Sequence, residues 1–194
     1  MKVQEFLHKS ALIMVLATLA CLAGCEQGQR ITAPPRNDHP VEKITFVIDI
    51  KSAQAGETYK VDGASVHYTT PTPGCGFMDY TRALGGIYRR PEARINFASS
   101  GNEVTIYRDY FKPRVICPFV IDQIIVGISV QNGSQVFINI NEFINHSNQK
   151  NYIRSRCVEY GSSHQDYQCY NDDDSWFDRV SKERHFTVDI RRLH

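Results

Sequence analysis

The sequence predicts a mostly β protein, built as an antiparallel β-sandwich or partly open barrel with one or two short helices. Three observations lead to this fold class. Apolar residues alternate with polar ones in several segments after residue 42, turn signals containing Gly and Asn separate those segments, and helical periodicity is scarce. The chain has 194 residues, of which 42% are hydrophobic, which is enough for one globular domain at residues 42–194.

The first and last ordered segments show the clearest strand pattern. Apolar residues alternate with mostly polar ones at Ile44, Phe46, Ile48 and Ile50, and again at Phe186, Val188 and Ile190. A period of two places each set on one face of a strand. We therefore expect two strands of the same kind, each with one buried face.

A hairpin is predicted around Gln131-Asn132-Gly133. A two-residue Asn-Gly turn would place Val126 opposite Asn139 and mix apolar with polar faces. A three-residue loop with Gly133 in the left-handed conformation matches the faces instead. It pairs Ile128 with Val136, Val126 with Ile138, and Ile124 with Ile140.

A second hairpin is predicted at Ser99-Ser100-Gly101-Asn102. A four-residue loop there pairs Phe97 with Val104 and Ile95 with Ile106 on one face. Face matching decides this choice, as it does for the first hairpin.

Residues 115–130 are apolar on both faces for much of their length, which predicts a central segment covered on both sides. Pro113 and Pro118 disfavour a regular strand before Phe119. Two short helices are expected elsewhere: residues 78–84, ending at Gly85, and a segment capped by Asp174 that continues to Val180.

The amino end has the pattern of a targeting segment. Lys2 and Lys9 precede a 13-residue apolar run at residues 11–23, interrupted only by Thr18. This run is too short for a transmembrane helix, which needs about 20 residues, but it suits the apolar region of a signal peptide. The run ends in Leu22-Ala23-Gly24-Cys25.

This ending resembles the lipobox of bacterial lipoproteins. The resemblance implies that residues 1–24 are removed and that Cys25 carries a diacylglycerol. Glu26 follows Cys25 in place of the Asp that marks inner-membrane retention in enterobacterial lipoproteins, so the resemblance implies an outer-membrane location facing the periplasm. Two alternatives remain: cleavage of an ordinary signal peptide after Ala20 or Ala23, or Cys21 as the lipid acceptor.

Residues 25–41 are predicted to form a tether behind the lipidated Cys25. The segment is polar and contains Pro34, Pro35 and Pro40, a composition that resists helix and builds no core. Such a chain would hold the domain away from the bilayer surface, where it can reach other envelope components.

Cysteine usage points to the same compartment. With Cys21 removed and Cys25 lipidated, four remain, and an even number in an exported chain predicts two disulfides. Four cysteines allow three pairings, of which we favour the sequential one, Cys75 with Cys117 and Cys157 with Cys169. Zinc is the competing hypothesis, but none of the spacings is the C-x₂-C type of a structural zinc site.

Few features of the sequence favour catalysis. No zincin, P-loop or Rossmann motif occurs, so we expect no cofactor and no metal. Asp79, Glu92, Asp109 and Asp166 are candidate carboxylates for glycoside hydrolysis, but nothing in their spacing singles them out. The mature chain carries equal numbers of basic and acidic side chains, which gives nucleic acid no basic field to bind.

Tyr and Arg enrichment is the main signal for binding. Both residue types are common at recognition sites. One predicted cluster surrounds Gly85-Gly86 and comprises Tyr80, Arg82, Tyr88, Arg89, Arg90 and Arg94. The alternative is that these are ordinary strand and surface residues.

Together these features predict a non-catalytic lipoprotein that binds an envelope protein or a cell-wall glycan, in the manner of an inhibitor, immunity protein or assembly component. The alternative function is a periplasmic hydrolase acting on cell-wall polymer. A third possibility is an assembly subunit that associates with itself, and the sequence leaves the oligomeric state open.

Overall fold

The computed structural model describes residues 32–52, 56–79, 86–131, 133–144, 150–160, 166–172, 175 and 185–193. These residues belong to two compact units. The larger unit comprises Thr32–Cys75 and Pro91–His194. In the smaller unit, the described residues form a two-stranded hairpin of β3 (Phe77–Asp79) and β4 (Ile87–Arg89). No helix among the described residues has the length and hydropathy needed to cross a bilayer.

The larger unit is an antiparallel β structure, which confirms the predicted fold class. Its strands are β1 (Lys43–Ser52), β2 (Tyr59–Thr69), β5 (Glu92–Ser100), β6 (Glu103–Tyr107), β7 (Val120–Val130), β8 (Gln135–Asn139), β9 (Tyr152–Tyr160), β10 (Asp166–Asn171) and β11 (His185–Leu193). A single 3₁₀ turn, η1 (Asn141–Phe143), is the helix found in the described part.

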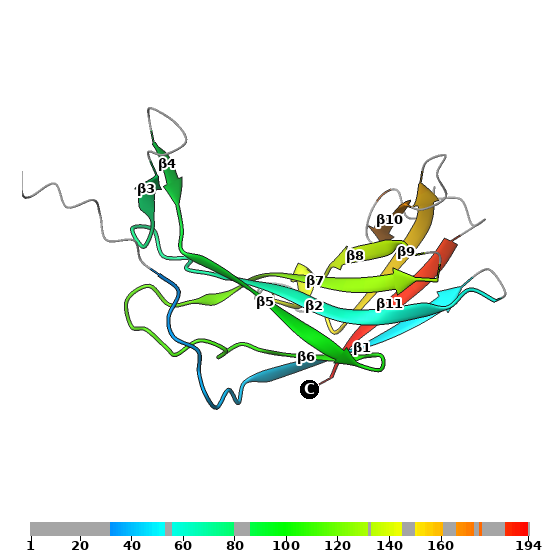
Figure 1. Ribbon diagram of the computed structural model, residues 1–194, viewed down its shortest axis with the longest axis horizontal. Coiled ribbons are helices and arrows are strands. Elements are labelled where there is room, and N and C mark those ends of the chain that lie inside the picture. Colours follow the sequence, from blue (N-terminus) through cyan, green and yellow to red (C-terminus); the bar gives the residue numbers. More distant parts are fainter. Residues whose placement is uncertain are drawn as a thin grey trace, which may run out of the picture. The chain divides into compact units, whose positions relative to one another are not determined.

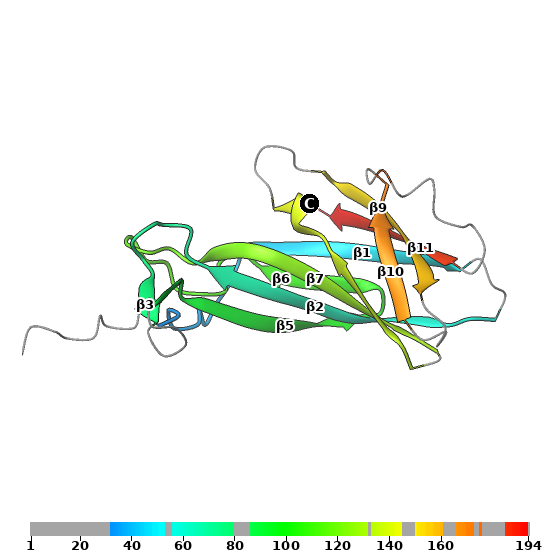
Figure 2. The ribbon, with the colours of Figure 1, turned by 90° about the horizontal axis from the view of Figure 1, so that it is seen from above.

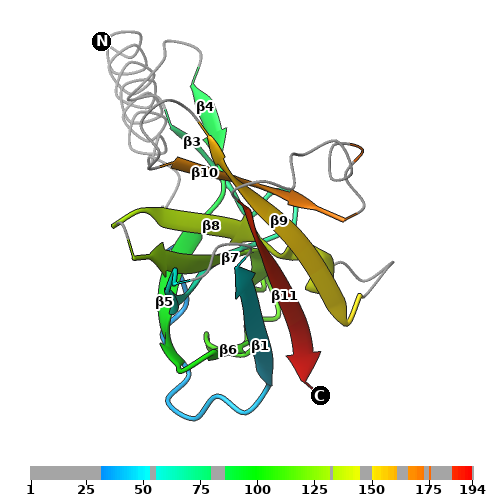
Figure 3. The same ribbon diagram turned by 90° about the vertical axis from the view of Figure 1, so that its right-hand side faces the viewer.

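The nine strands form one sheet in the order β10-β9-β11-β1-β6-β5-β2-β7-β8. The sheet bends into two layers between β6 and β5, because these strands pair only at Ser99 with Val104 and Ser100 with Glu103. Figure 1 shows the two strands diverging from that turn, and in Figure 2 β5, β2 and β7 run side by side in one layer. The edge strands β8 and β10 contact each other, so the sheet nearly closes (Figure 3).

The core lies between the two layers. β1 contributes Ile44, Phe46 and Ile48, and β11 contributes Phe186, Val188 and Ile190, all buried as the alternating pattern predicts. Ile50, the last position predicted for the buried face of β1, is only partly buried. β1 and β11 also pair directly with each other. Burial of these apolar side chains is the main stabilising term of such a fold.

The β7–β8 hairpin has the predicted register. Val126 pairs with Ile138 and Ile128 pairs with Val136. Gly133 adopts a φ of 89°, the left-handed conformation expected of it.

The β5–β6 hairpin differs from its prediction by two residues. A two-residue turn at Gly101 and Asn102 replaces the expected four-residue loop, so Ser99 rather than Phe97 pairs with Val104. A slip of two residues leaves every side chain on its own face, and face matching cannot detect it. Phe97 instead pairs with Ala64 in β2, because β5 leaves β6 to join the other layer.

Two further expectations are wrong. Residues 115–130 are not covered on both sides: β7 begins at Val120, after both prolines, and Val115 is 101% exposed. The helix predicted at residues 78–84 is contradicted at its start, because Met78 and Asp79 belong to β3. Residues 80–85 lie outside the described residues, as does nearly all of the helix predicted from Asp174.

Both predicted disulfides are confirmed. Cys75 is bonded to Cys117, and Cys157 is bonded to Cys169. The second pair directly joins opposite residues of the neighbouring strands β9 and β10.

The described part of the predicted tether packs on the larger unit. Asn37 donates its backbone N–H to the Tyr110 carbonyl at 2.9 Å, and Lys112 donates to the Pro35 carbonyl at 3.0 Å. Pro34 is buried. The segment that remains to act as a spacer therefore ends before Pro34.

Candidate functional site

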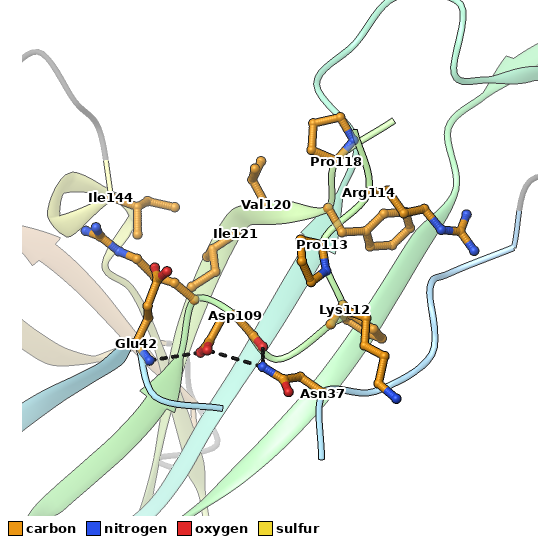
Figure 4. Close-up of a pocket in the computed structure, with 13 residues that line it drawn as sticks. Asn37, Glu42, Asp109, Lys112, Pro113, Arg114, Pro118, Val120, Ile121 and Ile144 are labelled. Atoms are coloured by element: carbon orange, nitrogen blue, oxygen red, sulfur yellow. Dashed lines mark hydrogen bonds between the residues drawn. The ribbon is translucent and has the colours of Figure 1, made fainter. Parts of the chain in front are cut away.

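A pocket of about 460 Å³ lies in the larger unit, where the amino-terminal segment meets the chain after β6. This volume is within the usual range for small-ligand pockets. Its lining residues are Asn37, Glu42, Arg108, Asp109, Phe111, Lys112, Pro113, Arg114, Pro118, Phe119, Val120, Ile121 and Ile144. Figure 4 shows Ile144 and Val120 on one side and Pro113 on another.

Asp109 builds one wall of the pocket. Its carboxylate accepts the backbone N–H of Val41 at 2.8 Å and that of Glu42 at 3.0 Å. It also accepts a hydrogen bond from the Asn37 amide at 3.2 Å (Figure 4). Asp109 therefore fixes the path of the incoming chain and places Glu42 at the pocket.

The floor of the pocket is apolar and aromatic. The buried Phe111 packs against Phe119 with ring centroids 5.5 Å apart, and edge-on against Tyr68 at 5.2 Å. Tyr68 is fully buried and donates its hydroxyl to the Tyr107 carbonyl at 2.5 Å. Burial, with smaller effects from Tyr110 and Asp109, raises the pKa of Tyr68 above its usual value, so this hydroxyl stays neutral.

Cationic side chains surround this floor. Lys112 forms an ion pair with Asp38 at 3.0 Å, and Arg114 donates to the Thr32 carbonyl at 3.3 Å. Arg108, two residues beyond the buried Ile106, is half-buried.

Arg192 is a second cation close to Arg108. It pairs with Phe46 across β1 and so points to the same face as that core residue. Burial lowers the pKa of Arg192, and the nearby charge of Arg108 lowers it further. Among the described residues, neither guanidinium has a hydrogen bond or ion pair within the protein. The guanidinium of Arg108, which lines the pocket, and that of Arg192, whose pKa the charge of Arg108 lowers, are strong donors for a carboxylate or phosphate.

The Tyr and Arg cluster predicted from the sequence is divided between the two units. In the smaller unit, Arg89 binds Asp79 at 2.8 Å, and the Tyr88 hydroxyl accepts the Gly76 N–H at 3.0 Å. Arg90 is exposed in the same unit. Arg94 belongs to β5 of the larger unit, opposite His67. Tyr80 and Arg82 lie outside the described residues.

The candidate catalytic carboxylates have separate partners. Asp79 binds Arg89, and Asp109 holds the amino-terminal segment. Glu92 lies 3.1 Å from Nε2 of His67, whose Nδ1 is 3.4 Å from Asp122. The side chain of Asp166 is outside the described residues. In the described ranges, no group of three or more His, Cys, Asp or Glu side chains is placed to hold a metal ion.

Arg108 and Arg192 were missed in the sequence, although one signal was visible there. The inward positions of the last strand run Phe186, Val188, Ile190, Arg192, so an arginine continues an apolar face. A charge at a core-facing position indicates either a strand end or a binding site. Arg108 shows the same pattern, because it follows the inward positions Val104 and Ile106.

Comparisons with protein families, with curated proteins and with solved structures find no match to this chain.

Proposed function

We propose that this protein is a non-catalytic lipoprotein of the bacterial cell envelope, which binds a periplasmic or cell-wall partner through the pocket beside Arg108. One observation carries the proposal: the half-buried Arg108 lines a pocket with an apolar floor and acts electrostatically on the half-buried Arg192, and neither guanidinium has a hydrogen bond or ion pair among the described residues. Desolvated like charges cost free energy, and an anionic ligand would offset that cost. The partner therefore presents an acidic group next to an apolar one.

The disulfides support a location outside the cytosol. All four cysteines downstream of Cys25 are paired, and such bonds persist in oxidising compartments such as the bacterial periplasm. The lipobox-like sequence at residues 22–25 then supports attachment of lipid to Cys25 and an outer-membrane location. Confinement to a membrane surface raises the local concentration of the domain, so a modest intrinsic affinity suffices for binding.

Binding is favoured over catalysis by the roles of the carboxylates. Asp79 and Asp109 each stabilise a different part of the protein, and Glu92 is bound to His67 on a strand surface. A periplasmic hydrolase of cell-wall polymer remains the alternative function. It predicts release of soluble fragments from purified peptidoglycan, lost on substitution Glu92→Gln.

Photo-crosslinking in the native envelope tests the proposal. Val120 lines the pocket and is 40% exposed, so p-benzoylphenylalanine at position 120 can reach a bound partner. Phe137 on β8 is 64% exposed and does not line this pocket, which makes position 137 a matched control.

We expect a discrete adduct from position 120 that is absent from position 137. The adduct should fall at least tenfold in the double variant Arg108→Gln, Arg192→Gln, because the guanidinium groups hold the acidic group. Capture of the same partner at both positions, or an adduct that the double variant leaves unchanged, would reject the pocket as the binding site.

A further inference from the structure

The loop between Pro113 and Pro118 presents two adjacent apolar side chains to solvent. Val115 is 101% exposed and Ile116 is 80% exposed. Single exposed apolar residues are common on protein surfaces. Two consecutive β-branched residues at a loop tip, both almost entirely uncovered, are a more specific feature.

This tip is held by the structure around it. Cys117 follows Ile116, is bonded to Cys75 and is buried. Its φ of 61° lies in the left-handed region, which a non-glycine residue occupies only when its surroundings fix it. Prolines at both ends restrict the backbone further. The apolar side chains therefore project from a constrained loop and lose little conformational freedom when they are covered.

The tip also lies close to the chain that leads to the expected anchor. Arg114, adjacent to Val115, donates from Nη1 to the carbonyl of Thr32 at 3.3 Å. The seven residue steps from Cys25 to Thr32 span at most about 25 Å when fully extended. A lipid on Cys25 therefore keeps this loop within reach of the bilayer surface.

The charges around the tip suit a lipid surface with a modest electrostatic contribution. Arg114 adds one cation beside the apolar pair, whereas Lys112 is paired with Asp38 at 3.0 Å. Basic residues next to inserted apolar side chains favour anionic headgroups. The apolar pair supplies most of the attraction.

We propose that Val115 and Ile116 insert into the phospholipid bilayer that carries the anchor, giving the domain a second contact with the membrane. The proposal rests on the proposed function for its location in the envelope. The diacylglycerol expected on Cys25 has two acyl chains and suffices for stable attachment, so the contribution of the loop is to orientation rather than to anchoring. Insertion at this loop would fix the orientation of the domain. It would also place Pro113 and Pro118, which line the pocket, next to the lipid headgroups.

The test uses the full chain in the native envelope, with p-benzoylphenylalanine at position 116 and cells grown in radioactive phosphate. We expect a phospholipid adduct at position 116 at least tenfold stronger than at the exposed control position 137. Adding Val115→Asp should reduce the adduct at least fivefold. Because Val115 is fully exposed, this substitution leaves the fold and the disulfides intact.

The crosslinked products at position 116 distinguish insertion into lipid from contact with protein. Adducts to a second copy of this chain, adducts to another protein, or equal lipid labelling at both positions would overturn the proposal. The mass of the lipid on Cys25 is measured in the same sample. A lipidated Cys25 without an adduct at position 116 would reject loop insertion and leave the anchor standing. An adduct without lipid on Cys25 would support insertion and reject the anchor.

Discussion

Asp49 and Asp189 lie directly opposite each other on the neighbouring strands β1 and β11. Like charges in this arrangement destabilise a sheet unless cations compensate them. Asp49 binds Arg191 at 2.5 Å. Asp189 is buried and accepts hydrogen bonds from Nε of Arg154 and the Tyr152 hydroxyl, both at 2.7 Å, and from Lys51 at 3.0 Å. The outer face of this layer is therefore stabilised by a network centred on Asp189.

The substitution Asp189→Asn should lower the free energy of unfolding by about 2 kcal/mol at pH 7. Hydrogen bonds from Arg154, the largest effect, with those from Tyr152 and Lys51, lower the pKa of Asp189 below its usual value. A lowered pKa in the folded state stabilises the protein above the unfolded pKa, and this contribution is lost as pH falls. Urea unfolding should show the difference from wild type shrinking by about 1 kcal/mol between pH 7 and pH 3.

Asp49→Asn is the matched control for this substitution. The side chains of Asp49 and Arg191 are 36% and 58% exposed, so solvent screens their ion pair. We expect a loss below about 1 kcal/mol at pH 7. Equal losses from both substitutions would show that burial does not distinguish the two carboxylates.

Gly63 and Gly127 provide a second matched pair, since they face each other across β2 and β7. Gly63 has a φ of +143°, and a Cβ there would lie 2.1 Å from the Phe97 carbonyl oxygen. The nearest contacts of a Cβ at Gly127 are at 3.8 Å. Gly63→Ala should therefore cost at least about 2 kcal/mol, whereas Gly127→Ala should stay within about 1 kcal/mol of wild type. Thermal unfolding of both variants should show a clearly larger loss of stability for Gly63→Ala than for Gly127→Ala.

The Cys75–Cys117 disulfide should protect the loop that follows Pro113. Its removal in the double variant Cys75→Ser, Cys117→Ser releases a constraint worth about 4 kcal/mol in the chain-entropy model. Trypsin should then cleave after Arg114, as seen by mass spectrometry of the fragments. The control variant Cys157→Ser, Cys169→Ser should leave that bond intact, and cleavage there in the control would refute a local role for the first disulfide.

Arg192 should contribute binding at the expense of stability. It is half-buried and repelled by Arg108, so Arg192→Met should leave the free energy of unfolding unchanged or raise it by up to about 1 kcal/mol. Arg191→Met, on the opposite face, removes the pair with Asp49 and should lower it by less than about 1 kcal/mol. Urea unfolding compares the two, and a clear loss of stability in Arg192→Met would indicate a structural role for that side chain.

Local patterns predicted much of the fold. Alternation identified β1 and β11, and face matching around a left-handed Gly133 identified the β7–β8 register. Face matching gave the wrong register for β5 and β6, because a shift of two residues leaves every side chain on the same face. The register of this hairpin is set by the pairing of Phe97 with Ala64 in β2, a long-range contact that no local pattern reveals.

The candidate pocket was harder to predict than the fold, and the predicted Tyr and Arg cluster stays a prediction. Tyr and Arg enrichment pointed to residues 80–94, but the pocket is formed by the amino-terminal segment and the chain after β6. Asp109 illustrates the reason. Considered alone it was a candidate catalytic carboxylate, whereas its hydrogen bonds to Val41 and Glu42, more than 60 residues away in the chain, define a structural role.

The proposed location of the protein and the proposed role of its pocket both depend on the chemistry of Cys25. Intact-mass and amino-terminal peptide analysis of the chain purified from membranes of an exporting bacterium tests this most directly. We predict a mature chain that begins at Cys25, carries a diacylglycerol on that sulfur and has no free thiol. A chain that begins elsewhere and carries no lipid would contradict the account.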